Sequence, residues 1–173
     1  MKIALFGGAF DPPHRGHVGI VEHLLEKRFD QVWIIPCWRH PLGKKSLPFW
    51  KRFRLCRLAF RPFGKKVRLQ DIERRLHLDR SWTVETLRYL CRKYPRQEWT
   101  LVIGEDNYQK RGEWRGFEEI EKRATLYRIP RGPSSSIPDV SSTEVRQKAA
   151  LGRDLTGLVP DSVCRYLGQH SIY

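Results

Sequence analysis

The chain has 173 residues, of which 40% are hydrophobic and 30% charged, proportions that are ordinary for a soluble globular protein. No apolar run approaches the roughly 20 residues of a membrane-spanning helix, and residues 2–6 lead into Asp11 instead of a cleavage site, which argues against membrane and secreted classes and favours the cytoplasm. The formal charge of +14, from 33 Lys and Arg against 19 Asp and Glu, predicts attraction to polyanions, either triphosphates or nucleic acid.

Strand-like and helix-like segments alternate along the chain without a linker, so we expect one domain over residues 1–173. Strands are predicted over 2–6, 32–36, 67–69, 99–103 and 124–129. Helices are predicted from the first histidines to residue 28 and over 49–60, 83–94, 142–151 and 161–168, and a surface loop over 131–138. This alternation favours an α/β fold, a Rossmann-like doubly wound parallel sheet of about five strands with helices on both faces.

Two further expectations concern the buried face of one helix and the state of the cysteines. The helix over 49–60 is expected to turn an apolar face around Trp50, Phe53, Cys56 and Phe60. The four cysteines form no Cys-x-x-Cys pair, so we expect reduced structural thiols at Cys37, Cys56, Cys91 and Cys164.

The segment from Gly7 to His17 joins the end of a strand, a glycine turn and the start of a helix. Glycines let backbone amides approach a bound group closely, and the first amides of the helix attract anions. His14 and His17, three positions apart, lie on one side of the first helical turn, where both can donate hydrogen bonds to phosphate oxygens. The segment therefore predicts a phosphate site.

Two plainer interpretations of this turn stay open. It could be a glycine turn with two solvent-exposed histidines, or a metal site that uses His14, His17 and His23, although no cysteine or further histidine completes a familiar zinc spacing. The dinucleotide-binding glycine fingerprint and the P-loop are both absent.

The turn resembles the signature of the nucleotidyltransferase superfamily, a Gly-x-Phe-Asp-Pro-like segment followed by His-x-Gly-His. Members of that superfamily transfer a nucleotidyl group from a nucleoside triphosphate. The resemblance implies that the turn binds the phosphates of ATP, through Gly7, Gly8, Ala9, Phe10, His14 and His17.

A second phosphate-type element covers residues 140–146. Ser141 and Glu144 have the spacing of a capping box, which by itself requires no ligand. The element also resembles the superfamily's Ile-Ser-Ser-Thr-x-x-Arg motif, with Val140 in place of isoleucine. That resemblance implies that the β- and γ-phosphates of ATP are held by Ser141, Ser142, Thr143 and Arg146.

A third element follows the predicted strand over 99–103. Taken singly, Asp106 is typical of a turn and Trp114 of a core. The frame of Gly104, Asp106 and Trp114 nevertheless resembles the nicotinate-mononucleotide adenylyltransferase branch, in which the tryptophan stacks on the nicotinate ring. This resemblance implies that Gly104 and Asp106 contact ATP, while Trp114 binds the mononucleotide.

The segment 81–87 resembles the Ser-Tyr-Thr-x-x-Thr-Leu segment of the same branch, which implies that backbone near Thr83 contacts the pyridine carboxylate. We also assign Asp11 to the mononucleotide side. After the second strand the chain departs from the branch, and His40 and Lys44 are candidate phosphate ligands there. A second aromatic residue is often found beside the stacking tryptophan, whereas this chain has Arg115, and the loop before Ser141 looks short.

The helix over 49–60 and its continuation carry a basic stripe of Arg54, Arg57 and Arg61. A solvated face is the default interpretation of such a stripe, and contact with nucleic acid is the alternative. Arg52 matches an arginine common in the branch, and its role is left open.

The resemblance implies an adenylyltransferase of NAD biosynthesis that joins ATP and nicotinate mononucleotide into nicotinate adenine dinucleotide and pyrophosphate by in-line attack on the α-phosphate. The implied catalytic residues are His14, His17, Lys44 and Arg146, with Mg²⁺ bound through ATP phosphates and no metal ligand from the protein. Alternatives are a nicotinamide-mononucleotide, phosphopantetheine or cytidylyl transferase on the same fold, and a basic nucleic-acid-binding protein. We expect no membrane partner and no nucleic acid, and a homo-oligomer is left open.

Overall fold

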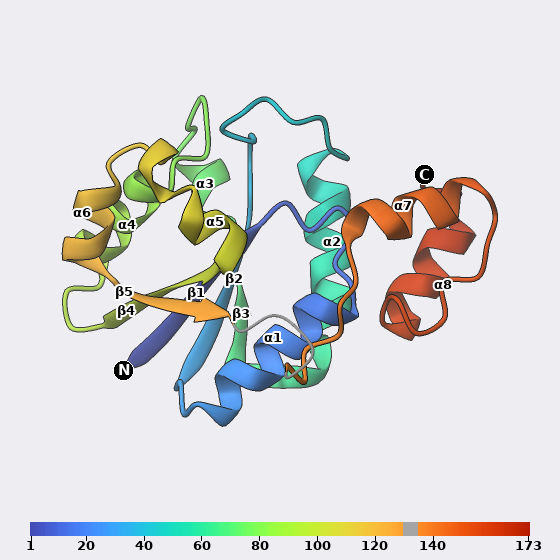
Figure 1. Cartoon of the computed structure of the whole chain (residues 1–173), viewed down its shortest axis with the longest axis horizontal. Helices are drawn as coiled ribbons and strands as arrows, with labels where there is room; N and C mark the ends of the chain where they lie inside the picture. Colours follow the sequence, from blue (N-terminus) through green and yellow to red (C-terminus); the bar gives the residue numbers. More distant parts are fainter. Residues whose placement is uncertain (130–134) are drawn as a thin grey trace.

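The computed structural model describes residues 1–129 and 135–173. Their centre is a five-stranded parallel sheet with the strand order β3-β2-β1-β4-β5, as Figure 1 shows. Its strands are β1 (Lys2–Gly8), β2 (Gln31–Pro36), β3 (Val67–Leu69), β4 (Glu98–Gly104) and β5 (Thr125–Ile129). The predicted α/β class, strand number and parallel sheet are confirmed.

Helices connect the strands and extend beyond the last one (Figure 1). The longer ones are α1 (Arg15–Glu26), α2 (Phe49–Phe60), α4 (Thr83–Lys93), α7 (Ser142–Ala150) and α8 (Asp161–Gln169). The shorter ones are α3 (Ile72–Arg75), α5 (Glu105–Gln109), α6 (Phe117–Arg123) and the 3-10 helices η1 (Arg61–Lys66) and η2 (Arg111–Glu113).

Each face of the sheet is covered by its own hydrophobic core, because alternate side chains of a strand point to opposite faces. In β1, Ala4 and Phe6 join a core with α1, α2 and α8, whereas Ile3 and Leu5 join a second core with α3, α4 and α6. Helices therefore lie on both faces, as the doubly wound arrangement predicts.

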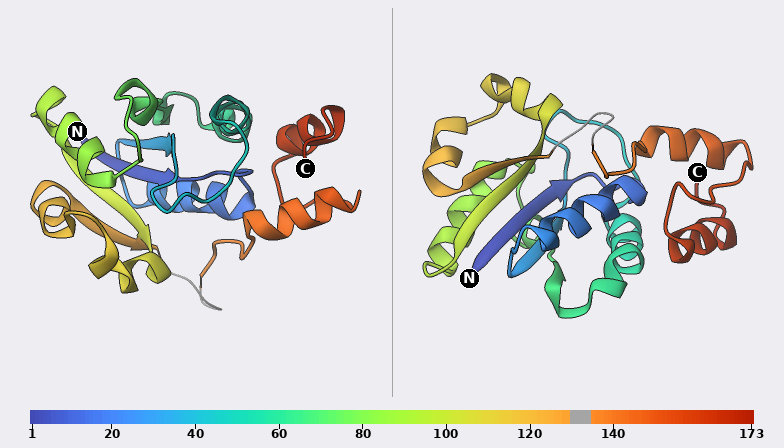
Figure 2. Two further views of the ribbon diagram at one scale, coloured as in Figure 1. Left: turned by 90° about the horizontal axis from the view of Figure 1, so that it is seen from above. Right: turned by 60° about the horizontal axis from the view of Figure 1, so that its bottom comes forward.

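The last two helices extend the molecule past the sheet. Both views of Figure 2 show α7 and α8 beyond the sheet, on the side of α2. The hydroxyl of Ser162 donates to the carbonyl of Leu58 at 3.1 Å, and Arg15 N donates to the carbonyl of Leu158 at 2.8 Å, so this lobe is attached to α2 and to the start of α1.

Several local predictions were wrong or incomplete. The expected apolar face of α2 is correct for Cys56 and Phe60, which are buried, and wrong for Trp50, which is 55% exposed. Phe49, Leu55 and the 2%-exposed Arg52 are buried as well. The short helices α3, α5 and α6 were not predicted, because they contain too few residues for a helical period to show.

The expected loop over 131–138 lies partly outside the described residues. Residues 135–138 are described and form neither helix nor strand. Among the described residues, no helix is long and apolar enough to cross a membrane. All four cysteines are free thiols.

Candidate functional site

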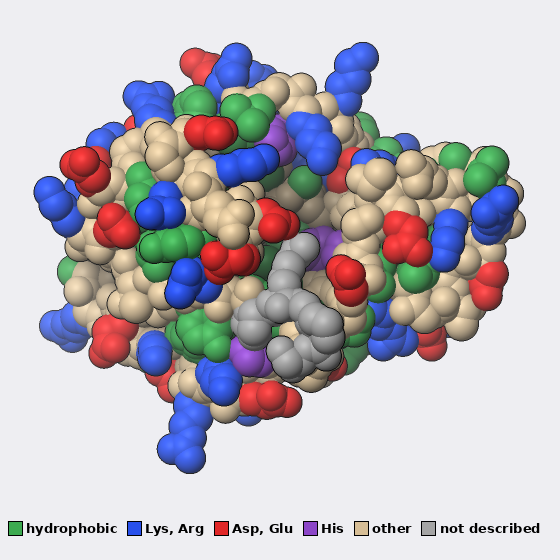
Figure 3. All heavy atoms as spheres, in the orientation of Figure 1, with side chains coloured by type: hydrophobic (Ala, Val, Ile, Leu, Met, Phe, Trp, Pro, Cys, Tyr) green, Lys and Arg blue, Asp and Glu red, His purple; other side chains and the backbone are tan. Residues whose placement is uncertain are grey.

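The site lies at the carboxyl edge of the sheet, where β1 ends at Gly8 and the chain turns into α1. Phe10 has a φ of +49°, an unfavourable value that is held by a fully buried ring packed edge-on against Phe6 and Phe60. Gly8 packs closely beside it, and a Cβ there would lie 3.3 Å from the Phe10 ring, which would have to shift slightly. Figure 3 shows the surface hollowed between the sheet and the C-terminal helices, with histidine side chains visible there.

The two predicted histidines form one rigid unit at the start of α1. Their rings stack with centroids 3.7 Å apart, His14 is only 7% exposed, and the Phe10 ring lies 4.8 Å from that of His17. The backbone N–H of His14 donates to Nδ1 of His17 at 3.2 Å. Because an amide can only donate, Nδ1 is the acceptor and the ring proton of neutral His17 is on Nε2, where it can serve an anion.

The structure brings the second phosphate element directly onto the first. The hydroxyl of Ser142 donates to the carbonyl of Pro12 at 2.9 Å, and the guanidinium of Arg146 donates to the carbonyl of Asp11 at 2.8 Å and to the Thr143 hydroxyl at 3.2 Å. The two motifs, more than a hundred residues apart, therefore form one site.

The capping box that starts α7 is present in part. Ser141 Oγ accepts from the backbone N–H of Glu144 at 3.1 Å, which fixes the end of the helix that presents its first amides. Ser141 and Thr143 are exposed beside this end.

The glycine of the His-x-Gly-His motif, Gly16, allows another segment of the chain to pack closely against α1. A Cβ on Gly16 would lie 2.8 Å from the carbonyl oxygen of Pro138, and one on Gly19 would lie 2.8 Å from Cδ of the same proline. The segment ending at Pro138 therefore packs directly on α1, a contact that the sequence did not predict.

Asp11, predicted to bind the mononucleotide, has its carboxylate committed to the protein. It is 5% exposed and accepts from Leu47 N at 3.3 and 3.4 Å and from the hydroxyl of Tyr173 at 2.7 Å. Sequence reasoning missed Tyr173, since a tyrosine 162 positions away carries no local signal of this contact.

Arg52, whose role the sequence left open, connects three turns around the site. Its buried guanidinium donates to the carbonyls of Ala9 and Cys37, both at 2.6 Å, and to that of Leu47 at 2.8 Å. A side chain with five donors in a fixed plane can hold three backbone segments at once.

The loop after β2 is held at its first residues by a buried polar cluster. Glu73 and Ser81 both accept from Trp38 N at 3.0 Å, and Ser81 also accepts from Arg39 N at 3.0 Å. Burial raises the pKa of Glu73 and raises that of Cys37 to about 11, so this thiol is not an activated nucleophile.

Farther along the same loop are His40, which is partly buried, and Lys44. Partial burial, and then the charges of Lys44 and Arg52, lower the pKa of His40. His40 is therefore neutral near pH 7, and a bound anion would favour its protonation. Lys44 is exposed.

The predicted pyridine elements also meet in space. A Cβ on Gly116 would lie 3.2 Å from Val84, so the turn after Trp114 packs against the first turn of α4, which begins at Thr83. The Arg115 guanidinium lies 5.7 Å from the centre of the Trp82 ring. Trp114 is partly buried with its ring edge-on to Phe117 at 6.1 Å.

The remaining predicted residues lie along the same edge of the sheet. Gly7 and Gly8 pair with Ile35 and Pro36 at the end of β1, and Gly104 ends β4 just before Asp106 in the first turn of α5.

No group of three His, Cys, Asp or Glu side chains in the described residues could hold a metal. His23 instead contacts the hydroxyl of Tyr127 at 2.7 Å.

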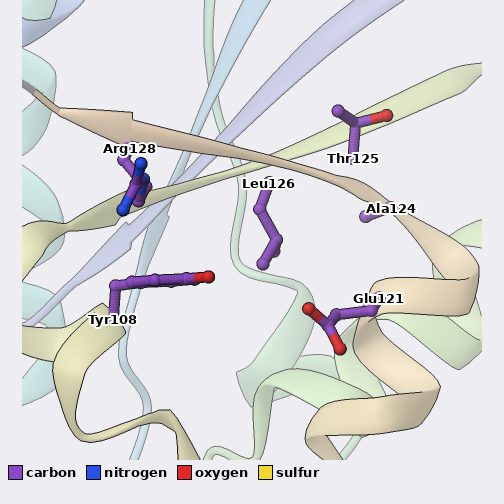
Figure 4. A pocket seen from close by; sticks show the side chains of 6 residues that line it. All are labelled: Tyr108, Glu121, Ala124, Thr125, Leu126 and Arg128. Atoms are coloured by element: carbon purple, nitrogen blue, oxygen red, sulfur yellow. The ribbon is translucent and has the colours of Figure 1, made fainter.

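Figure 4 shows a hollow formed by β5 together with one residue each of α5 and α6. It measures about 360 Å³ and is lined by Tyr108, Glu121, Ala124, Thr125, Leu126 and Arg128, none of which was predicted to be a site residue.

The residues of the basic stripe, Arg54, Arg57 and Arg61, are all exposed on α2 and η1.

Comparison with known proteins gives a consistent result. The model of the cytidylyltransferase-like family matches residues 5–148. A probable nicotinate-nucleotide adenylyltransferase of Anaeromyxobacter dehalogenans strain 2CP-1 is 34% identical over 181 residues, which covers 99% of this chain and 96% of the relative. One of Flavobacterium johnsoniae is 32% identical over 193 residues, covering 100% and 99%.

Solved structures agree with this comparison. A putative nicotinate-nucleotide adenylyltransferase of Vibrio parahaemolyticus is 29% identical, with a TM-score of 0.80 over 97% of this chain and 92% of the other. The Plasmodium falciparum nicotinic acid mononucleotide adenylyltransferase, solved with NaAD, shares the fold at a TM-score of 0.82 and 18% identity, over 99% and 97% of the two chains.

Proposed function

The chain belongs to the cytidylyltransferase-like family, and on that premise we propose that it is a nicotinate-nucleotide adenylyltransferase, which joins ATP and nicotinate mononucleotide into nicotinate adenine dinucleotide and pyrophosphate. The observation that carries the proposal is the docking of Ser142 and Arg146 on the backbone of residues 11–12, beside the stacked histidines. The first turns of α1 and α7, which attract anions, would then face one triphosphate together with the imidazoles of His14 and His17 and the guanidinium of Arg146.

The reaction needs no protein nucleophile. An oxygen of the mononucleotide phosphate forms a bond to the α-phosphorus of ATP, and the bond from that phosphorus to the bridging β-oxygen breaks, so that pyrophosphate leaves with its electron pair. Catalysis then consists of holding two anions in line and stabilising charge on the equatorial and leaving oxygens.

Imidazole and guanidinium groups supply that stabilisation. We assign the Nε2–H of His17 to the α-phosphate and His14 to the departing phosphates, because the stacked rings and the Nδ1 contact keep both imidazoles oriented. Arg146 uses two of its nitrogens on Asp11 and Thr143, yet a guanidinium has five N–H donors, so it can hold the turn and bind a phosphate together.

Mg²⁺ is the expected cofactor, because it neutralises charge on triphosphate oxygens in this class of reaction. Phosphate oxygens and water would hold it. This fits a site whose described residues offer no cluster of three acidic or histidine ligands and whose Asp11 carboxylate already accepts from two donors, the Leu47 N–H and the Tyr173 hydroxyl.

The acceptor occupies the side of the site formed by the loop after β2 and the start of α4. We assign its pyridine ring to Trp114, its carboxylate to the backbone at Thr83 and to Arg115, and its phosphate to His40 and Lys44. The short distance between Arg115 and the Trp82 ring supports a cation at the pyridine end, which favours the acid over the amide.

A pyrophosphate-release assay tests this function. The wild-type protein is given ATP and Mg²⁺ with nicotinate mononucleotide, nicotinamide mononucleotide or phosphopantetheine. Turnover with nicotinate mononucleotide at the highest kcat/KM supports the proposal, whereas a preference for either other acceptor, or no pyrophosphate release, contradicts it. His170→Ala changes an exposed histidine that directly follows α8 and is a matched control for the histidine variants below.

A further inference from the structure

We propose that Tyr173 is a positioning residue of the acceptor side, acting through Asp11 on the segment that carries Lys44. The inference rests on the proposed function and names a residue of the same site. Its hydroxyl donates to Oδ1 of Asp11 at 2.7 Å, across 162 positions of sequence.

The Asp11 carboxylate connects Tyr173 to the loop after β2. The same two oxygens accept the backbone N–H of Leu47 at 3.3 and 3.4 Å. Leu47 closes a run of exposed residues, Leu42 to Ser46, which includes Lys44. At its other end the loop is attached through Trp38 and Arg39 to Ser81 and through the Pro41 carbonyl to Arg80. Leu47 is the attachment after the exposed run, where Asp11 accepts its N–H and Arg52 donates to its carbonyl.

The two sides of the site depend on different atoms of Asp11. Arg146 binds the carbonyl oxygen of this residue, whereas Leu47 and Tyr173 share its carboxylate. Loss of the tyrosine hydroxyl therefore frees the carboxylate to rotate or to recruit water, which weakens the hydrogen bond to the N–H of Leu47. The bond of Arg52 to the Leu47 carbonyl and that of Arg146 to the Asp11 carbonyl stay in place. The effect should fall on the acceptor rather than on ATP.

The hydroxyl is a donor throughout the usable pH range. Burial, followed by the hydrogen bond to Asp11 and the negative charge there, raises the pKa of Tyr173 far above its ordinary value. A buried carboxylate that accepts a neutral hydroxyl is held in one rotamer, which is what a positioning contact requires.

The test compares Tyr173→Phe with Tyr166→Phe, a control on α8 whose ring contacts His170 and Arg54 away from the site. Net loss of one hydrogen bond predicts a rise of about 3- to 10-fold in the KM for nicotinate mononucleotide in Tyr173→Phe. The KM for ATP and the kcat should stay within about twofold, and Tyr166→Phe should change neither KM.

A double-variant cycle shows whether Tyr173 acts through Lys44. In a Lys44→Ala background, adding Tyr173→Phe should leave the KM for the mononucleotide unchanged, because the positioned charge is already gone. Equal rises in both KM values, no rise in either, or an additive effect in the Lys44→Ala background would overturn the inference.

Hydrogen exchange separates this inference from the proposed function. The amide of Leu47 should exchange faster in Tyr173→Phe than in Tyr166→Phe at equal melting temperature, whichever acceptor is used. Unchanged exchange at Leu47 overturns the positioning role even in an active enzyme. Faster exchange in a protein that releases no pyrophosphate with nicotinate mononucleotide sustains the contact and refutes the function.

Discussion

The guanidinium of Arg146 donates to the backbone carbonyl of Asp11 at 2.8 Å, although 135 positions separate the two residues. This bond joins the start of α7 to the turn before α1, and the Ser142 hydroxyl on the Pro12 carbonyl strengthens the junction. Hydrogen bonds within the protein thus hold these two elements together, so the proposed nucleotide would not have to order one against the other.

Arg146→Lys should lower kcat/KM for ATP by about 10- to 100-fold, since an ammonium cannot hold the Asp11 carbonyl and a phosphate in one plane. Steady-state kinetics with varied ATP measure the change. Arg153→Lys, an exposed arginine of the same lobe, is the control. A ratio close to that of the control would remove the guanidinium geometry from the mechanism.

His17→Ala should lower kcat by on the order of 10²-fold, because it removes a donor aimed at the charge that develops on the α-phosphate. Binding of the mononucleotide, measured by calorimetry, should change much less. Turnover within a few-fold of wild type, with His170→Ala behaving alike, would show that the imidazole does not touch the reacting phosphate.

Trp114→Ala should raise the KM for nicotinate mononucleotide by about tenfold, the loss expected for one aromatic stacking contact, and leave the KM for ATP nearly unchanged. Trp114→Phe should retain part of the affinity. Kinetics with each substrate varied in turn provide the comparison, and a parallel rise in both constants in a folded variant would argue against stacking.

Lys44→Ala should raise the pKa of His40. Burial is the main cause of the lowered pKa, and the positive charge of Lys44, which this substitution removes, is the next. The pKa should stay below that of an exposed histidine, since the burial is unchanged. An NMR titration of the His40 ring checks this. In wild type, added mononucleotide should move the same pKa upward, so acceptor affinity should rise as pH falls through the His40 transition. A pKa that responds to neither change would place His40 away from Lys44 and the acceptor.

Gly16→Ala should lower the free energy of unfolding by about 1–3 kcal/mol, because its Cβ would lie 2.8 Å from the carbonyl of Pro138. Gly168→Ala, in α8 with nothing within 4 Å, should instead be neutral or stabilise by up to about 1 kcal/mol. Urea unfolding of both variants gives the comparison. Equal effects would mean that Pro138 does not pack on α1.

The chain order of strands and helices and the positions of the phosphate motifs could be predicted because each depends on neighbouring residues. Hydrophobic period identified all five strands, and α2 was predicted with its observed bounds. The motifs at Gly7 to His17 and at Ser141 to Arg146 were recognisable in the same way, since glycine turns and helix starts are made of consecutive residues.

Contacts between distant segments had no such signal. The guanidinium of Arg52, whose role was left open, is buried and donates to three carbonyls. Trp50 is exposed instead of buried, and Gly16 lies against Pro138. The same is true of Tyr173 on Asp11. These contacts form only when segments distant in the sequence come together in the folded protein. The free energy of burying or pairing a polar group depends on which segment covers it, and the local spacing of residues does not carry that information.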